Sequence, residues 1–215
     1  MRMALSANNE PIPVGDAAAA SSAEQRTAAR YTPLIRTAKI TGISGEFLCV
    51  VSDISSSGVS VRLFHPLPRD HALNLEMPNG DSLALERVWE KEGRAGFRFA
   101  GDIDLGRVLA GQGDWPKRPI RLNLDMPAKL AGLTGRFDAT IKNISMQGAQ
   151  IECASRLAID QRLRLSNALL PEIVTKVRWR RGTLYGLIFD NTFQFADLAK
   201  TVALAQGLAI EKQPA

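Results

Sequence analysis

The sequence contains few of the residues from which catalytic and metal centres are built. It has two histidines and two cysteines among 215 residues. His65 and His71 stand beside a proline-rich bend, without a cysteine or carboxylate at metal-ligand spacing. No Ser-His-Asp arrangement, P-loop or dinucleotide-binding glycine pattern occurs, and the acidic residues are scattered. The chain is therefore not expected to be an enzyme or to hold a metal or cofactor, and both histidines are expected at the surface.

The scarcity of cysteine argues against a disulfide framework. Cys49 and Cys153 lie at non-equivalent places among apolar neighbours, which is typical of thiols in strands. Such residues fit a reducing compartment. The first ten residues contain no apolar core of a secretory signal, and no apolar run is long enough to span a bilayer. These features predict a cytoplasmic protein without a membrane span.

Aromatic residues make up only 6% of the chain, while the net charge is +5 and the isoelectric point is near 9.5. A basic chain of this kind suits an anionic partner, but the same charge is also found on merely soluble surfaces. The expected strand faces lack the paired exposed aromatics on which single-stranded bases stack. Nucleic acid is therefore not the expected partner.

What the sequence does contain is an internal repeat with an offset of ninety residues. Asp53-Ile-Ser-Ser-Ser-Gly58 recurs as Asn143-Ile-Ser-Met-Gln-Gly148. The same offset relates further lysine, glycine, phenylalanine and tryptophan positions: Lys39 and Lys129, Gly42 and Gly132, Gly45 and Gly135, Phe47 and Phe137, Trp89 and Trp179, Gly96 and Gly186, and Phe99 and Phe189. A repeat of this length is a small domain, so the chain consists of two copies of one fold.

Both copies contain short runs of β-type residues separated by turns. In the first copy the runs are 47–51, 59–64, 72–77, 83–89 and 95–99, with a hairpin turn expected at Asn79 and Gly80. In the second copy they are 136–141, 149–153, 162–165, 173–179 and 185–189. Strands of this length and spacing favour an antiparallel barrel or a sandwich.

The remaining segments complete the domain organisation. Residues 1–25 are rich in Ala, Ser, Pro and Asn and are expected to form a disordered arm. The first domain is assigned to residues 26–103, a linker with a short helix to 104–116, and the second domain to 117–211. Residues 193–208 place Phe195, Leu198, Val202 and Ala205 near a helical period. They are therefore expected to form a C-terminal amphipathic helix that packs on its own domain.

Each copy also begins with two basic residues four positions apart. They are Arg26 and Arg30 in the first copy and Lys117 and Arg121 in the second. Together with the turn motifs that follow, they resemble the PilZ domain, a small β-barrel family that binds the bacterial second messenger cyclic di-GMP. The family motifs are R-x-x-x-R at the N-terminal edge of the barrel and [DN]-x-S-x-x-G at a strand-turn-strand junction. The resemblance covers nearly everything after residue 25.

The resemblance implies a mainly β fold of two tandem small antiparallel β-barrels, with the C-terminal helix. It also implies that the first copy binds cyclic di-GMP through Arg26, Arg30, Asp53, Ser55 and Gly58. Arginine can hold a phosphate or a guanine edge with two hydrogen bonds and can stack on a purine. A carboxylate accepts hydrogen bonds from guanine, and glycine tolerates both positive φ and close approach of a ligand.

The second copy departs from the family pattern at its first basic residue. Lys117 keeps a point charge but lacks the planar fork of arginine, and Asn143 accepts less strongly than Asp53. Its candidate site comprises Lys117, Arg118, Arg121, Asn143, Ser145 and Gly148. The first copy is therefore expected to be the stronger site.

Each motif also has a purely structural interpretation. The segment from Asp53 to Gly58 is a good hairpin turn in which Asp and Ser bond their own backbone. Arg26 and Arg30 suit a solvated arm. Trp89 and Trp179 are expected in the two cores rather than at a ligand.

The resemblance thus implies a non-enzymatic cyclic di-GMP receptor. Its ligand would order the arm or rearrange the domains, and so alter the engagement of a downstream protein partner. The alternative is a degenerate PilZ-like module that works through protein contacts and has little nucleotide affinity.

Overall fold

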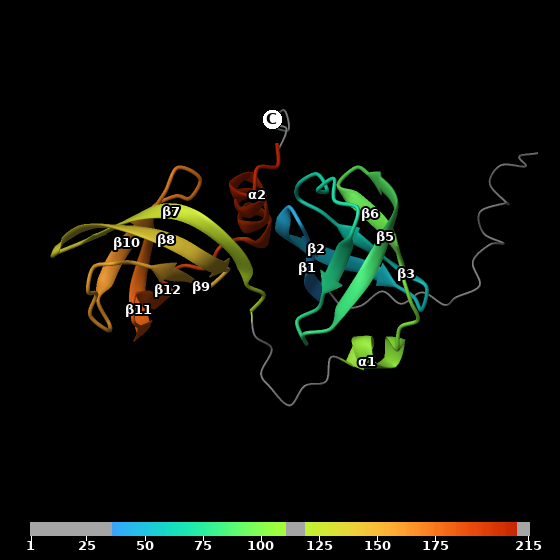
Figure 1. The fold of residues 1–215 in the computed structure, drawn as a ribbon, viewed down its shortest axis with the longest axis horizontal. Coiled ribbons are helices and arrows are strands. Elements are labelled where there is room, and N and C mark those ends of the chain that lie inside the picture. The colour runs from blue at the N-terminus through green and yellow to red at the C-terminus, as the bar shows by residue number, and fades with distance from the viewer. Residues whose placement is uncertain (1–35, 111–118, 210–215) are drawn as a thin grey trace, which may run out of the picture.

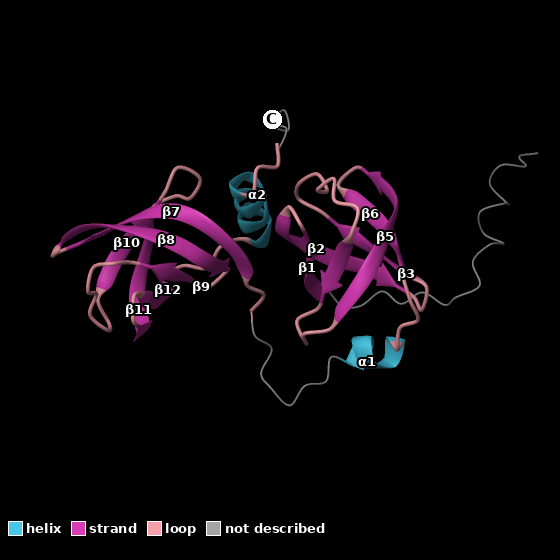
Figure 2. Ribbon diagram, viewed as in Figure 1, coloured by secondary structure: helices cyan, strands magenta, loops and turns pink. Residues whose placement is uncertain are grey.

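Two closed β-barrels, each of six antiparallel strands, stand side by side (Figure 1). The computed structural model describes residues 36–110 and 119–209. Helix α2 (Phe195–Ala205) lies between the barrels, and strands far outnumber helices (Figure 2). The predicted mainly β fold of two tandem barrels with a C-terminal helix is confirmed.

The first barrel closes in the order β1-β2-β3-β6-β5-β4. Its strands are β1 (Arg36–Gly42), β2 (Gly45–Ile54), β3 (Gly58–Arg62), β4 (Leu73–Glu76), β5 (Ser82–Lys91) and β6 (Arg94–Phe99). The turn between β4 and β5 contains Asn79 and Gly80. The N–H of Gly80 donates to the carbonyl of Met77 at 2.9 Å, and Gly80 has a φ of 89°, which glycine adopts without strain. Helix α1 (Leu105–Ala110) follows β6 and buries Val108 in the core of this barrel.

The second barrel closes in the order β10-β11-β12-β9-β8-β7. Its strands are β7 (Leu122–Gly132), β8 (Gly135–Ser145), β9 (Gly148–Glu152), β10 (Arg162–Ser166), β11 (Ile173–Arg181) and β12 (Leu184–Phe189). Each run expected from the sequence overlaps one strand, and α2 begins ninety residues after α1, so the repeat extends through the helices. Of the helices in the described residues, none has the length and apolar character that crossing a bilayer requires.

β7 has a register shift between Asn123 and Met126. Four further shifts are β-bulges that recur at the ninety-residue offset. They fall between Val51 and Asp53 in β2, Arg87 and Trp89 in β5, Ile141 and Asn143 in β8, and Val177 and Trp179 in β11. A bulge bends its strand and changes the direction of the side chains beside it. Each one therefore sets the direction of a motif residue or of a repeated tryptophan.

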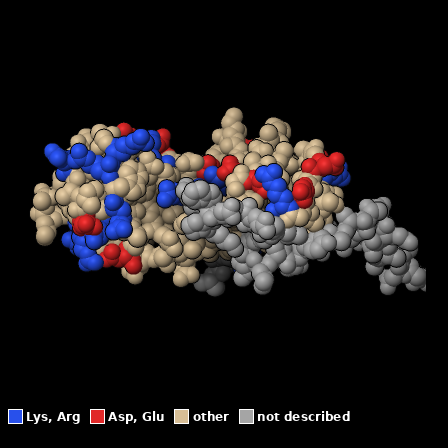
Figure 3. Space-filling model, turned by 90° about the horizontal axis from the view of Figure 1, so that it is seen from below, with Lys and Arg blue, Asp and Glu red and all other residues tan. Residues whose placement is uncertain are grey.

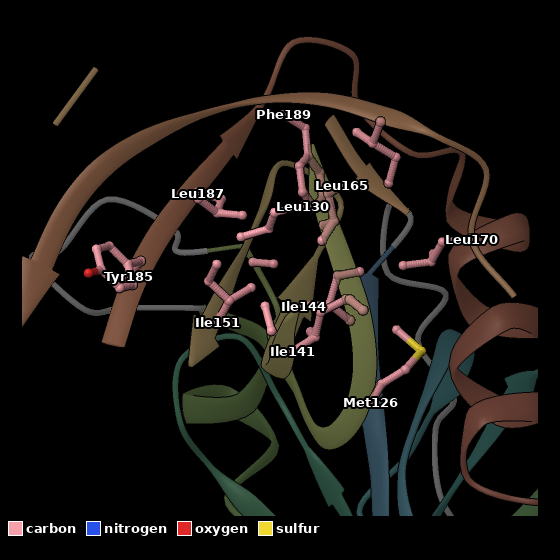
Figure 4. Close-up of a cluster of buried hydrophobic side chains, with 14 of the residues drawn as sticks. Met126, Leu130, Ile141, Ile144, Ile151, Leu165, Leu170, Tyr185, Leu187 and Phe189 are labelled. Carbon is pink, nitrogen blue, oxygen red and sulfur yellow. The ribbon is translucent and has the colours of Figure 1, made fainter. Parts of the chain in front are cut away.

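Inward-facing aliphatic side chains fill each barrel, and Figure 4 shows part of the second core. Side chains from facing strands meet there, and α2 covers the end of the barrel beside Met126 and Leu170. The one polar atom of the buried Tyr185 is satisfied, because its hydroxyl donates to the carbonyl of Ser155 at 3.0 Å and accepts from the N–H of Leu157 at 3.3 Å.

Helix α2 packs on both barrels. Its residues Leu198 and Val202 are buried in the second core. Phe195 meets Phe64 of the first barrel edge to face, with the ring centroids 5.6 Å apart. Leu48 of β2 belongs to the same apolar cluster. The helix therefore packs on its own domain, as expected, and also holds the neighbouring barrel.

Polar contacts between the barrels centre on Glu46 of β2. Its backbone N–H donates to Oε1 of Gln206 and its carbonyl accepts from Nε2 of Gln206, both at 2.7 Å. Its carboxylate accepts from the backbone N–H and the side-chain amide of Asn123, both at 2.8 Å, and from Lys39 at 2.9 Å. We call Lys39, Glu46, Asn123 and Gln206 the Glu46 cluster.

Two further features stabilise the contact that the Glu46 cluster makes between the barrels. A Cβ on Gly45, which has a φ of 132°, would overlap the amide oxygen of Gln206, so only glycine fits there. Burial lowers the pKa of Lys39, but its hydrogen bonds to Glu76 and Glu46 outweigh this effect and raise it. Lys39 therefore stays charged and fixes the carboxylate that holds Asn123.

Candidate ligand-binding site

The turn between β2 and β3 brings part of the first motif together. Ser55 is buried, and its backbone N–H donates to the carbonyl of Gly58 at 2.8 Å. Its hydroxyl lies 3.3 Å from the same oxygen and accepts from the N–H of Ser57 at 3.4 Å. Ser145 makes the same two hydroxyl contacts, to Gly148 at 3.1 Å and from Gln147 at 3.4 Å. Both hydroxyls bond the backbone of their own turn and so shape the loop that a ligand would meet.

The two motif glycines are required by a neighbouring strand. Neither Gly58 nor Gly148 has a positive φ. A Cβ on Gly58 would overlap the carbonyl oxygen of Phe97 on β6, and one on Gly148 would overlap that of Leu187 on β12. The tolerance of glycine for a positive φ is therefore not what these two positions use. Glycine allows the strands to approach closely.

Asp53 and Asn143 each bond a side chain on the following strand. The hydroxyl of Ser60 donates to the carboxylate of Asp53, and the amide of Asn143 donates to Oε1 of Gln150 at 2.7 Å. Both contacts join residues paired in register, so they occupy the same place in the two barrels. The first barrel presents a carboxylate there and the second presents two amides.

A row of paired residues leads from these side chains to the repeated tryptophans. In the first barrel it runs Asp53, Ser60, Gly96, Trp89, and in the second Asn143, Gln150, Gly186, Trp179. The indoles lie on the outer face, 44% and 39% exposed, and each covers the glycine beside it. The expectation that they belong to the cores is wrong, because the bulge before each one alters its direction. Each site thus has a flat aromatic surface beside its motif.

In the second barrel this row borders a pocket of about 250 Å³. Its lining includes Arg121, Asn143, Gln150, Arg178 and Trp179, and none of the described residues that line it is acidic. Guanidinium groups bind phosphates and purine edges, amides can donate or accept, and an indole offers a stacking surface. The pocket therefore has the chemistry to hold an anion that carries planar rings.

Positive charge is concentrated on the second barrel. Residues 36–110 contain nine Lys and Arg and ten Asp and Glu, whereas residues 119–209 contain twelve and seven. Figure 3 shows large basic areas with smaller acidic ones over the second barrel, while basic and acidic side chains mix on the first. The field of the second barrel therefore favours the approach of an anionic ligand.

The structure places the predicted site residues as follows. Asp53, Ser55 and Gly58 lie together at the turn between β2 and β3, whereas Arg26 and Arg30 lie outside the described residues. In the second copy the pocket is lined by Arg121, Asn143, Ser145 and Gly148. Lys117 and Arg118 lie outside the described residues.

Gln150, Arg178 and Trp179 line the pocket although no motif in the sequence assigned them to it. The tryptophan could have been found, because it is repeated at the ninety-residue offset beside a repeated glycine. Arg178 could not, since the equivalent residue of the first copy is Val88. Only the bulge and the pocket reveal its position.

The histidines and cysteines form no second site in the part of the chain that the structure describes. His65 is buried, with Nδ1 2.8 Å from the carbonyl of Pro66 and Nε2 3.3 Å from that of Leu48, so its expected surface position is wrong. Burial lowers its pKa. Cys49 and Cys153 are buried free thiols, and burial raises the pKa of Cys49. Among the described residues, no group of three His, Cys, Asp or Glu is placed to hold a metal ion.

The similarity of this chain to known proteins lies at the level of a protein family. The family model of the PilZ domain matches residues 24–109 and again residues 117–204. Similar solved structures include the PlzA protein of Borreliella burgdorferi in complex with c-di-GMP, at 13% identity, covering 78% of this chain and 87% of that one, with a TM-score of 0.33. The K. pneumonia MrkH–c-di-GMP complex is 15% identical, with 79% and 84% covered and a TM-score of 0.31. Escherichia coli YcgR in complex with c-di-GMP is 8% identical, with 79% and 82% covered and a TM-score of 0.29. No curated protein gave a significant match.

Proposed function

Because the chain belongs to the PilZ domain family, with one domain in each half, we propose that it is a non-enzymatic receptor for cyclic di-GMP. The observation that carries this proposal is the row of Asp53, Ser60, Gly96 and Trp89, which recurs at equivalent positions in the second barrel. Two barrels that keep a polar side chain and an exposed indole at equivalent places beside the family motif present related binding surfaces. The buried free thiols fit a cytoplasmic location, where the messenger would be met.

Each group of the row would meet a different part of the ligand. Cyclic di-GMP carries two phosphates, for which Arg26 and Arg30 or Arg121 supply charge-assisted hydrogen bonds. The carboxylate of Asp53 would accept from the N–H groups of a guanine edge. The exposed faces of Trp89 and Trp179 would stack on guanine rings.

The Glu46 cluster offers a route from the ligand to the arrangement of the barrels. Arg121 lines the second pocket, and Asn123, two residues further along, donates twice to Glu46 of the first barrel. A ligand that binds Arg121 and shifts its backbone would therefore also shift Asn123 and change the contact between the barrels. Occupancy would favour one of two barrel arrangements, and a downstream protein would bind one of them more tightly.

Titration calorimetry with cyclic di-GMP tests the receptor, with cyclic di-AMP as the control ligand. Each hydrogen bond from a charged group contributes about 1.5–3 kcal/mol. The variant Arg26→Ala, Arg30→Ala should therefore lose about a hundredfold or more in affinity at the first site. Arg94→Ala is the matched control, because Arg94 is exposed on β6 away from the motif. Equal affinity of the double variant and the wild type would remove the two arginines from the site.

The second candidate is a protein-interaction module with little nucleotide affinity, favoured by Lys117 where the family has arginine. It predicts no heat and no thermal shift with cyclic di-GMP, together with a stable protein partner in a pull-down. Selective binding of the nucleotide to the wild type would rule it out as the main function.

A further inference from the structure

The two barrels place an arginine at different points beside the same motif. Arg98 of β6 pairs in register with Gly58, whereas Ile188 of β12 pairs with Gly148. On the adjoining strands the order is reversed, because Val88 of β5 corresponds to Arg178 of β11. The first barrel therefore has its arginine on β6 and an aliphatic residue on β5. The second barrel has its arginine on β11 and an aliphatic residue on β12.

The backbone of β11 accounts for the position of Arg178. The pairing of β11 with β12 steps from Val177 to Trp179, so Arg178 is the extra residue of the bulge. It is exposed and lines the pocket beside Trp179 and Ile188. A bulged residue is released from the alternation of the strand and can direct its side chain to a site.

Among the residues that the structure describes, Arg178 forms one ion pair, and its contact distance is long. Its Nη1 lies 4.0 Å from Asp160, which makes a closer contact of 2.9 Å with Lys176. Exposed ion pairs of this kind contribute little, and solvent and salt weaken them further. The guanidinium can therefore exchange Asp160 for a ligand at small cost.

We propose that Arg178 is a ligand-binding residue of the second barrel and supplies, with Arg121, the planar bidentate group that this copy lacks at Lys117. The inference rests on the proposed function and deepens it, since it makes the second barrel a cyclic di-GMP site in its own right. Among the described residues that line the pocket, two are arginines and none is acidic, so both guanidinium groups can engage a phosphate or a guanine edge. Arg98 would act in the first barrel from the opposite strand.

The experiment measures ligand binding by the pocket of the second barrel alone, in the full chain. Arg26→Ala with Arg30→Ala disables the first site, and cyclic di-GMP is titrated calorimetrically into this protein and into versions with one further substitution. Arg178→Ala should weaken the remaining binding about tenfold or more, as expected for the loss of a charge-assisted hydrogen bond. Arg180→Ala is the matched control, because Arg180 is exposed on the same strand and does not line the pocket. It should leave the affinity within about twofold, since exposed charges outside a contact contribute little.

Two further variants test the shape of the guanidinium group and the effect of its ion pair with Asp160, and thermal unfolding checks that the variants remain folded. Arg178→Lys keeps the charge but not the fork, so its affinity should fall between those of the alanine variant and the parent. Asp160→Asn frees Arg178 and should tighten binding, and asparagine tolerates the φ of 64° found at this position. Thermal unfolding of the variants at positions 160, 178 and 180 should agree closely with that of the parent double variant, because the side chains substituted at these positions are exposed.

The outcomes distinguish this inference from the proposed function. Equal affinities of Arg178→Ala and Arg180→Ala would overturn the role of Arg178 and leave the receptor intact. Binding that disappears completely with Arg26→Ala and Arg30→Ala would show that the second pocket is no site, and would overturn the inference alone. A wild type that binds no cyclic di-GMP would overturn both.

Discussion

The indole of Trp179 lies so close over Gly186 that a Cβ on this glycine would overlap the indole nitrogen. Trp89 covers Gly96 in the same way in the first barrel. Each ring therefore rests on bare backbone of the neighbouring strand, and its place depends on the absence of a side chain there. Because Gly186 also pairs with Gln150, the ring stands next to the amide that Asn143 bonds.

Gly186→Ala should displace the indole of Trp179. We expect a loss of about 1–3 kcal/mol in the free energy of unfolding, as for other overpacked sites, together with a shift in tryptophan fluorescence and weaker cyclic di-GMP binding by the second barrel. Gly101→Ala is the control, because a Cβ there meets open space. Unchanged fluorescence and affinity would show that the ring position does not depend on this glycine.

Gly148→Ala should destabilise the protein more than Gly186→Ala. The added methyl group would overlap the carbonyl oxygen of Leu187, and a strand backbone yields less readily than a half-exposed indole. The expected loss lies at or above the upper end of the range of about 1–3 kcal/mol. Urea unfolding measures it, and Gly58→Ala should have the same effect in the first barrel. A smaller loss than for Gly186→Ala would contradict this reading of the motif glycine.

The repeat made most of the fold predictable, because each strand had to be placed at equivalent positions in both copies of the sequence. The opening strands β1 and β7 were missed as separate runs. β7 contains Pro127, which is rare within strands, and β1 mixes small and polar residues. Their identity as strands depends on closure of the barrels, through pairing of β1 with β4 and of β7 with β10. Such long-range pairing leaves no local pattern.

The site was predictable only where a motif marked it. Asp53, Ser55 and Gly58 were singled out by spacing, and the turn pattern anticipated that Ser55 bonds its own backbone. Spacing could not show that Gly58 faces the backbone of Phe97. The outward position of the tryptophans follows from bulges that no residue pattern announced. Large aromatic residues in strands are usually buried, so the sequence alone favoured the wrong environment for them.

Gln206→Ala should loosen the contact between the barrels without unfolding either one. The substitution removes two hydrogen bonds of 2.7 Å to the backbone of Glu46, each expected to contribute about 0.5–1.5 kcal/mol. Small-angle X-ray scattering should show a larger radius of gyration than for the wild type. Gln161→Ala is the control, because Gln161 bonds Ala158 and Thr134 within the second barrel. An unchanged scattering curve would mean that the apolar contact of Phe64 with Phe195 suffices to hold the barrels.

His65 should make the stability of the protein depend on pH. Burial lowers the pKa of its imidazole below the ordinary value of 6.5, so the unfolded chain takes up a proton at a higher pH than the folded one does. Stability is therefore undiminished above about pH 6.5 and falls as the pH drops toward the lowered pKa, by at most about 1.4 kcal/mol for each pH unit. Thermal unfolding between pH 7.5 and pH 5 measures the slope. His65→Gln should flatten it, whereas His71→Gln, at an exposed position, should leave it unchanged. Equal slopes for the wild type and His65→Gln would assign the pH dependence to other groups.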